Sequence, residues 1–150
     1  MSDRDIHGRL LLFEVGGSCF ALPISSVLEV AEPEPLSCIP TLPMRVGGAM
    51  NYHGDALPVI RSEALLELDG VAGAGEHVLV VKDRLTDLGR LGMPVDRVHG
   101  LVDGQGATAT GPDPVAEKRH LDRRLASVLD PRRLLERAEH VIERVVAGGD

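Results

Sequence analysis

Aromatic residues are scarce in this sequence, which has no tryptophan, one tyrosine and two phenylalanines among 150 residues. Aliphatic side chains must therefore fill most of the core. A barrel that binds nucleic acid by stacking needs several aromatic rings, so the scarcity argues against that class. The net charge of −7 argues against it too, because a phosphate backbone attracts clustered Lys and Arg.

Cysteine is also scarce, and the six histidines show neither HxH nor HxxxH spacing. Cys19 and Cys38 cannot form a disulfide framework, and we expect both to be buried or half-buried free thiols. The spacing of these residues predicts no metal site, and no cofactor is expected.

Long apolar runs are missing as well. None approaches the roughly 20 residues of a membrane-spanning helix, so we expect no direct membrane insertion. The charged residues at the N-terminus, Asp3 to Asp5, are not followed by the apolar segment of a signal peptide. These observations predict a soluble, cytoplasmic protein.

Glycine and proline are plentiful instead, at 17 and 10 residues, and they separate short apolar segments. This pattern predicts many short strands that close into small β-barrels. The glycine-rich segment 69–75 divides the strands into two groups. We therefore expect one domain, residues 1–150, in which a first barrel (9–68) and a second barrel (76–130) pack together on a shared apolar interface.

A helix is expected at the end of the chain, over residues 131–147. Asp130 can cap its first N–H groups, and Pro131 suits the first helical position. One apolar stripe recurs with helical spacing and consists of Leu134, Leu135, Ala138, Val141, Ile142 and Val145. We expect the stripe to pack on the chain's own strands; the alternative is that it docks on a partner helix.

The segment GAMNYHGDALPVI, residues 48–60, predicts a hairpin with Gly54 in its turn. A turn alone does not require Tyr52 and His53. No catalytic constellation accounts for them either: Gly16 to Phe20 lacks the second glycine of a nucleophile elbow, and the glycines of 69–75 do not precede a helix. A binding protein is therefore the default interpretation. The segment Val27 to Val30 either lines a partner groove around Glu29 or simply alternates between solvent and core.

Four segments, taken in order, resemble the CheW-like domain of bacterial chemotaxis coupling proteins. LLLFEVGGSCFALPISSVLEVAE (10–32) is similar to the opening of that family. IPTLPMRVGGAMNYHGDALPVI (39–60) resembles its I-P-x-x-P and N-L-R-G signature. LGMPVDRVHGLV (91–102) and LDRRLASVLDPRRLL (121–135) resemble its G-L-x-V-D segment and its closing segment. Each match alone is weak, but four matches in the right order are specific.

The resemblance implies an all-β fold with a C-terminal helix, built from two SH3-like five-stranded barrels. It implies no enzyme activity. Such proteins are adaptors in chemotaxis-like, two-component signal transduction, and they join the cytoplasmic helical tip of a methyl-accepting chemoreceptor to the regulatory domain of a CheA-type histidine kinase. The receptor's helical hairpin is expected in the groove between the barrels, and the kinase against a barrel end. The partner-binding residues expected on this basis are Val27, Glu29, Val30, Asn51, Tyr52, His53, Gly54, Val95 and Asp96.

The chain departs from the family pattern in two places. His53 stands where the family has an arginine near the carboxylate at Glu29, so we expect Glu29 and His53 to interact. The segment 115–121 has a charged centre, Glu117 to Arg119, where the family has a glycine and apolar residues. A strand cannot bury that centre without pairing every charge, so we expect a solvated edge or a loop.

The second departure leaves an alternative function open. The protein would then be a divergent CheW paralogue that binds receptors but incorporates kinase poorly. A small barrel that binds a ligand or nucleic acid is a further, less favoured alternative. In each case the strand spacing predicts the same buried residues, namely Leu11, Phe13, Phe20, Leu22, Val59, Val80, Leu125 and Leu129.

Overall fold

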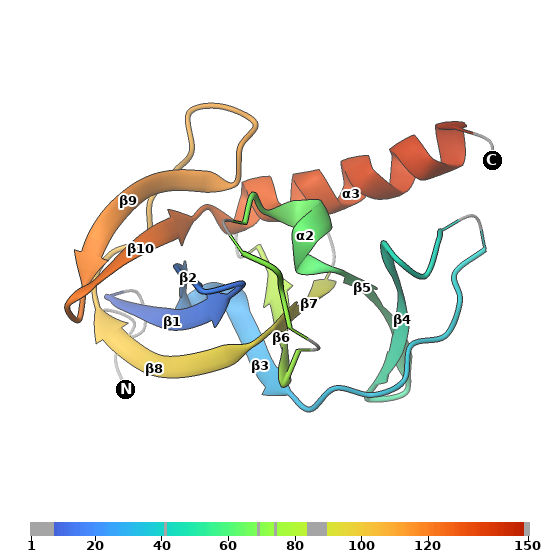
Figure 1. Ribbon diagram of the computed structural model, residues 1–150, viewed down its shortest axis with the longest axis horizontal. Coiled ribbons are helices and arrows are strands. Elements are labelled where there is room, and N and C mark those ends of the chain that lie inside the picture. The colour runs from blue at the N-terminus through green and yellow to red at the C-terminus, as the bar shows by residue number, and fades with distance from the viewer. Residues whose placement is uncertain (1–7, 41, 69, 74, 84–89, 149–150) are drawn as a thin grey trace.

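The computed structural model describes residues 8–40, 42–68, 70–73, 75–83 and 90–148, with the side chains of 144–148 left out. Within this part of the chain the strands are β1 (Arg9–Val15), β2 (Ser18–Pro23), β3 (Val27–Ala31), β4 (Gly47–Tyr52), β5 (Asp55–Ile60), β6 (His77–Lys82), β7 (Arg90–Val95), β8 (Arg97–Asp103), β9 (Val115–Leu121) and β10 (Arg124–Leu129). The helices are η1 (Ile24–Ser26), α2 (Ser62–Leu65) and α3 (Pro131–Gly148). Figure 1 shows α3 lying along one side of the strands.

The strands form two five-stranded sheets, each the basis of a barrel-like subdomain, and this confirms the expected fold class. The first sheet has the order β8-β1-β2-β10-β9 and the second the order β3-β6-β7-β5-β4. In Figure 1 the first sheet lies on the left and β4 and β5 of the second lie on the right.

The expected division of the strands at residues 69–75 is wrong. β1 and β2 join strands from the end of the chain, and β6 and β7 join the strands β3 to β5. The chain changes sheet after β2, and again at Asp96, the single residue between β7 and β8. Glycine content indicates a connection between elements, but strand membership is decided by non-local pairing such as the parallel β2–β10 ladder.

Side chains that alternate along the strands build three apolar clusters. Leu10 and Leu12 of β1 face a small core inside the first sheet, whereas Leu11 and Phe13 face the core between the subdomains. Strand β6 does the same, because Val78 and Val80 face the inside of the second sheet and Leu79 and Val81 face the shared core. Both faces of these strands are therefore buried, which accounts for their nearly continuous apolar sequences.

Seven of the eight residues expected in the core are buried, and Leu125 is the exception at 55 % exposed. Leu125 lies opposite His120 of the edge strand β9. The buried face of β10 instead carries Ala126 and Val128. The expectation for the cysteines is also partly wrong, since Cys19 is half-buried but Cys38 is exposed.

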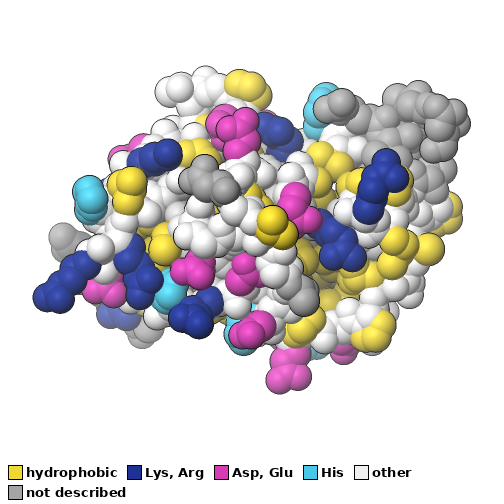
Figure 2. Space-filling view, in the orientation of Figure 1, with side chains coloured by type: hydrophobic (Ala, Val, Ile, Leu, Met, Phe, Trp, Pro, Cys, Tyr) yellow, Lys and Arg dark blue, Asp and Glu magenta, His cyan; other side chains and the backbone are white. Residues whose placement is uncertain are grey.

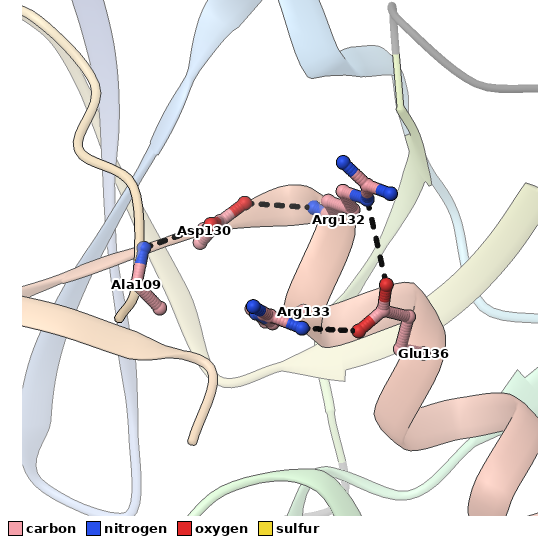
Figure 3. A network of polar contacts seen from close by, with 5 residues as sticks. All are labelled: Ala109, Asp130, Arg132, Arg133 and Glu136. Carbon is pink, nitrogen blue, oxygen red and sulfur yellow. Dashed lines mark hydrogen bonds and ion pairs between the residues drawn. The ribbon is translucent and has the colours of Figure 1, made fainter. Parts of the chain in front are cut away.

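Helix α3 begins as expected at Pro131, after Asp130. One carboxylate oxygen of Asp130 accepts a hydrogen bond from the Arg132 N–H at 3.0 Å, and the other accepts one from the Ala109 N–H at 2.9 Å (Figure 3). The apolar stripe packs on the shared core through Leu134, Leu135 and Ala138, with Val141 and Ile142 partly buried beside it. The side chain of Val145 lies outside the described residues. The described stripe thus packs on the chain's own elements.

The charged segment 115–121 is strand β9, at the edge of the first sheet and paired only with β10. Its Glu117 and Lys118 are exposed, and Arg119 Nη2 lies 2.8 Å from Glu117 Oε1. The expectation of a solvated edge is confirmed. Among the described residues, no helix has the length and apolar character needed to cross a membrane.

Candidate partner-binding surface

The β4–β5 hairpin turns at His53 and Gly54, whose φ angles of 50° and 89° are both positive. Positive φ at both central residues is the mark of a type I′ turn, which matches the twist of the flanking strands. The Asn51 side-chain oxygen accepts a hydrogen bond from the Gly54 N–H at 3.0 Å. Asn51 and Gly54 thus shape the turn, and His53 stands at its tip with 70 % of its side chain exposed.

Strand β3 is the opposite edge of the same sheet and pairs only with β6. Its register shifts between Val27 and Glu29, so Leu28 is the extra residue of a β-bulge. The bulge interrupts the in–out alternation, and Leu28, Glu29 and Val30 are all exposed. The sequence Val27 to Val30 therefore does not simply alternate between solvent and core.

The two edges meet at Glu29. The Tyr52 hydroxyl donates a hydrogen bond to Glu29 Oε1 at 3.3 Å, and His53 Nε2 lies 3.1 Å from the same oxygen. An ionised carboxylate only accepts, so this Nε2 must carry a proton to make the bond. The expected Glu29–His53 contact is confirmed, and it joins β3 to the β4–β5 turn at the other edge of the sheet.

Tyr52 is the buried member of this cluster, with a relative exposure of 9 %. Its burial raises the pKa of the phenol above the usual value of 10, and the charge and hydrogen bond of Glu29 raise the pKa further. Arg90, whose guanidinium lies 5.9 Å from the centre of the Tyr52 ring, partly opposes this rise in pKa. The phenol therefore stays protonated at neutral pH and remains a hydrogen-bond donor to Glu29.

This arrangement provides a shaped surface around one carboxylate. Glu29 is held in place by two donors, while the apolar side chains of Leu28 and Val30 beside it are 44 % and 40 % exposed. Figure 2 shows further hydrophobic side chains gathered over the part of the second subdomain where Figure 1 draws β4. Exposed apolar side chains around a fixed polar group are typical of a protein–protein contact.

Of the nine residues expected to bind partners, the structure brings five together: Glu29, Asn51, Tyr52, His53 and Gly54. Val30 lies beside them on β3 and Val27 is half-buried. The side chain of Val95 is fully buried in the shared core and lies apart from these residues.

Asp96 has a structural task. Its carboxylate accepts hydrogen bonds from the Gly16 N–H at 2.8 Å and the Gly73 N–H at 3.0 Å. These bonds tie the β1–β2 turn and Gly73 to the point where the chain changes sheet. These two hydrogen bonds within the chain are reason enough for an aspartate at this position, and no contact with a partner protein is needed to account for it.

Sequence reasoning missed two residues of the surface, Leu28 and Arg90. Leu28 belongs to the segment Val27 to Val30 that was considered for a partner groove, but it was not among the expected binding residues because regular alternation would turn it away from Glu29. The bulge breaks that alternation. Arg90 contacts the Tyr52 ring from β7, and no sequence motif around either residue predicts that contact.

Comparisons with known proteins agree with this geometry. The family model of the CheW-like domain matches residues 9–139. Among solved structures, the scaffolding protein TtCheW from Thermoanaerobacter tengcongensis superposes with a TM-score of 0.66 at 20 % sequence identity, covering 82 % of this chain and 84 % of that one. A search of the curated proteins finds no match. The family model spans both sheets and the first half of α3, and the chain therefore belongs to the CheW-like domain family.

Proposed function

We propose that this protein is a non-enzymatic cytoplasmic adaptor that couples the helical tip of a chemoreceptor to the regulatory domain of a CheA-type histidine kinase. Its membership of a scaffold family supports this general role. The observation that carries the proposal is the Glu29–Tyr52–His53 cluster, which stands beside exposed Leu28 and Val30 at the site of the family's turn motif.

The surface proposed for partner binding consists of Leu28, Glu29 and Val30 of β3 together with His53 and Gly54 of the turn. Tyr52 is buried beneath this surface and bonds to Glu29. Asn51 fixes the shape of the turn by accepting the hydrogen bond from the Gly54 N–H. The apolar side chains supply contact area, and Glu29 supplies a fixed acceptor that gives orientation.

Binding of the purified full chain to the host's receptor tip and to the kinase regulatory domain tests the proposal. Val30→Glu should weaken binding of at least one partner by tenfold or more, since it puts a charge in a contact that is expected to exclude water. The matched control is Val71→Glu, which makes the same change at a residue 95 % exposed and outside both sheets. Equal affinities for wild type and Val30→Glu, toward both partners, would contradict this surface.

Strand β9 favours the second candidate, a paralogue that binds receptors but incorporates kinase poorly. It presents exposed Glu117 and Lys118 where the family pattern has a glycine and apolar residues. Desolvating these charges would penalise any partner that packs on this edge, whereas the β3 surface lies on the other sheet.

The two candidates differ in their affinities. The coupling adaptor should bind receptor tip and kinase domain with comparable, micromolar or tighter, affinity. The divergent paralogue should bind the receptor at least tenfold more tightly than the kinase. If it does, a double substitution of Glu117 and Lys118 by valine should strengthen kinase binding and leave receptor binding unchanged.

A further inference from the structure

Three side chains with metal-binding chemistry converge on the first sheet, away from the partner surface. Glu14, Cys19 and His99 come from β1, β2 and β8, and one ligand atom of each lies within 4.8 Å of the other two. Glu14 and Cys19 are directly opposite each other in the β1–β2 ladder. A carboxylate, a thiol and an imidazole thus meet at one place.

A bulge in the neighbouring strand aims His99 at this pair. Leu12 pairs with Gly100 and Phe13 pairs with Val98, so His99 is the extra residue of β8. Gly100, with a φ of 113°, accommodates the bend. The bulge therefore presents His99 on the face of the sheet where Glu14 and Cys19 lie.

The imidazole nitrogen that faces the cluster lacks a hydrogen bond. His99 Nε2 is buried and has no hydrogen-bond partner within the described part of the chain. This nitrogen lies 3.5 Å from Glu14 Oε1, which is an ion-pair distance when the imidazole is protonated, and only 13 % of the His99 side chain is exposed. A buried polar atom without a partner is unfavourable, and coordination of an ion would satisfy it.

We propose that Glu14, Cys19 and His99 form a binding site for Zn²⁺. Thiolate, imidazole and carboxylate are the ligands that zinc prefers, and three protein ligands leave a fourth tetrahedral position for water. Solvent can supply that water, because Glu14 is 29 % exposed. Calcium and magnesium fit poorly, since they require oxygen ligands.

The distances are compatible with this ion after small side-chain rotations. Zinc bonds of about 2.0 to 2.3 Å hold tetrahedral ligand atoms roughly 3 to 4 Å apart. The present separations of up to 4.8 Å need to close by only about an ångström. On binding, Cys19 loses its thiol proton to solvent and ligates as the thiolate.

The ion would cross-link three strands of the first sheet. β1 and β2 form a hairpin, but β8 comes from a distant part of the sequence. The site lies on the other sheet from Glu29 and His53, so zinc would stabilise the scaffold without entering the proposed partner surface.

Cobalt(II) is the probe for the test, because its tetrahedral thiolate complexes absorb strongly in the near ultraviolet. The full chain, reduced, free of metal and without an affinity tag, is titrated with Co²⁺ and then with Zn²⁺. We expect one thiolate-to-cobalt band that saturates at one ion per chain and is removed by one equivalent of zinc. Zinc in hundredfold excess over its Kd should raise Tm by about 5–10 °C.

Cys19→Ser and His99→Gln should weaken binding by more than about 100-fold, because even outer-shell substitutions cost 10- to 100-fold in metal affinity. Cys38→Ser and His120→Gln are the matched controls, since both residues are exposed, and they should change nothing. Glu14→Gln should give an intermediate loss and serves as the milder variant if another fails to show a native circular dichroism spectrum.

Absence of the cobalt band in the wild-type chain would overturn the proposal. So would a band that survives Cys19→Ser, or one that disappears equally in Cys38→Ser. In those cases the three side chains are an ion pair beside a half-buried thiol and nothing more.

Discussion

At the scale of single residues, the hydrogen bond from Tyr52 to Glu29 fixes the carboxylate of the proposed partner surface. The phenol is buried while the carboxylate that accepts its hydrogen bond is exposed, so the pair connects the inner core of the second sheet to solvent. The Glu29–His53 contact is exposed on both sides and contributes at most about 1 kcal/mol to stability. Its value lies in orienting Glu29.

The single tyrosine of the chain makes its titration directly observable, because no other residue contributes to the tyrosinate absorbance. We expect the pKa of Tyr52 to lie above 10 and to fall in Glu29→Gln, which removes the neighbouring charge but leaves the burial. Glu32→Gln removes an exposed charge near the same strand and should not change the pKa. A titration midpoint unaffected by Glu29→Gln would contradict the hydrogen bond.

The same shift has a consequence for stability. The folded pKa of Tyr52 is raised above the unfolded value, so the stabilisation is complete below the unfolded pKa of about 10 and is lost as the pH rises through the folded pKa.

Phe20 and Leu125 form a matched pair for a test of the core. Phe20 is 3 % exposed and its ring lies 6.0 Å from that of Phe13, whereas Leu125 is 55 % exposed. Phe20→Ala should lower the free energy of unfolding by about 3–5 kcal/mol, because it leaves a cavity in the shared core. Leu125→Ala should change it by less than about 0.5 kcal/mol. Urea denaturation measures both, and a loss below about 1 kcal/mol for Phe20→Ala would refute its placement.

At the scale of elements, Asp130 is the residue that joins β10, α3 and the loop before β9. It is 7 % exposed and satisfies two backbone N–H groups, one of them on Ala109, which is itself buried. Figure 3 shows the carboxylate between the loop and the first turn of the helix. The bond to Ala109 is buried and the bond to Arg132 is partly buried, so losing the carboxylate leaves at least the Ala109 N–H without a partner.

Asp130→Ala should therefore lower the free energy of unfolding by about 1–3 kcal/mol. Asp130→Asn should cost less, since the amide keeps one acceptor oxygen and loses the other. Glu136→Gln is the comparison, because Glu136 pairs with Arg132 and Arg133 on a partly exposed face of the same helix. That change should cost less than about 1 kcal/mol. Equal losses for Asp130→Ala and Glu136→Gln in urea denaturation would contradict the capping role.

At the scale of the whole molecule, the two subdomains share one large core. The shared cluster draws side chains from β1 and β2 of the first sheet, from β6 and β7 of the second, and from α2 and α3. The chain also passes from one sheet to the other more than once. The first sheet therefore needs both ends of the sequence, and the second sheet, from Val27 to Val95, is a continuous segment inserted between them.

We accordingly expect the full chain to unfold in a single cooperative transition. Tyr52 fluorescence reports the second sheet and far-ultraviolet circular dichroism reports the whole, and the two should give the same midpoint in urea. Fragments 1–75 and 76–150 should each lack a cooperative melt when expressed alone. Separate midpoints, or one fragment that folds by itself, would show that the subdomains are independent.

The sequence alone determined the features that depend on neighbouring residues. Strand and turn positions follow from short apolar segments between glycines and prolines, and α3 follows from Asp130, Pro131 and the spacing of its apolar stripe. The charged centre of β9 also identified an edge, because unpaired charges are too costly to bury. The resemblance of four segments to one family supplied the contact between Glu29 and His53.

The tertiary structure decided everything that depends on pairing between distant segments. Ladders such as β2–β10 decide which strands share a sheet. For this reason the strands do not divide into two groups at residues 69–75. The burial of Val95 and the exposure of Leu125 depend on which face of a strand meets the core. Glu14, Cys19 and His99 meet only because three strands align and a bulge turns His99 toward the others. No spacing within one segment could have shown this, because each ligand comes from a different strand.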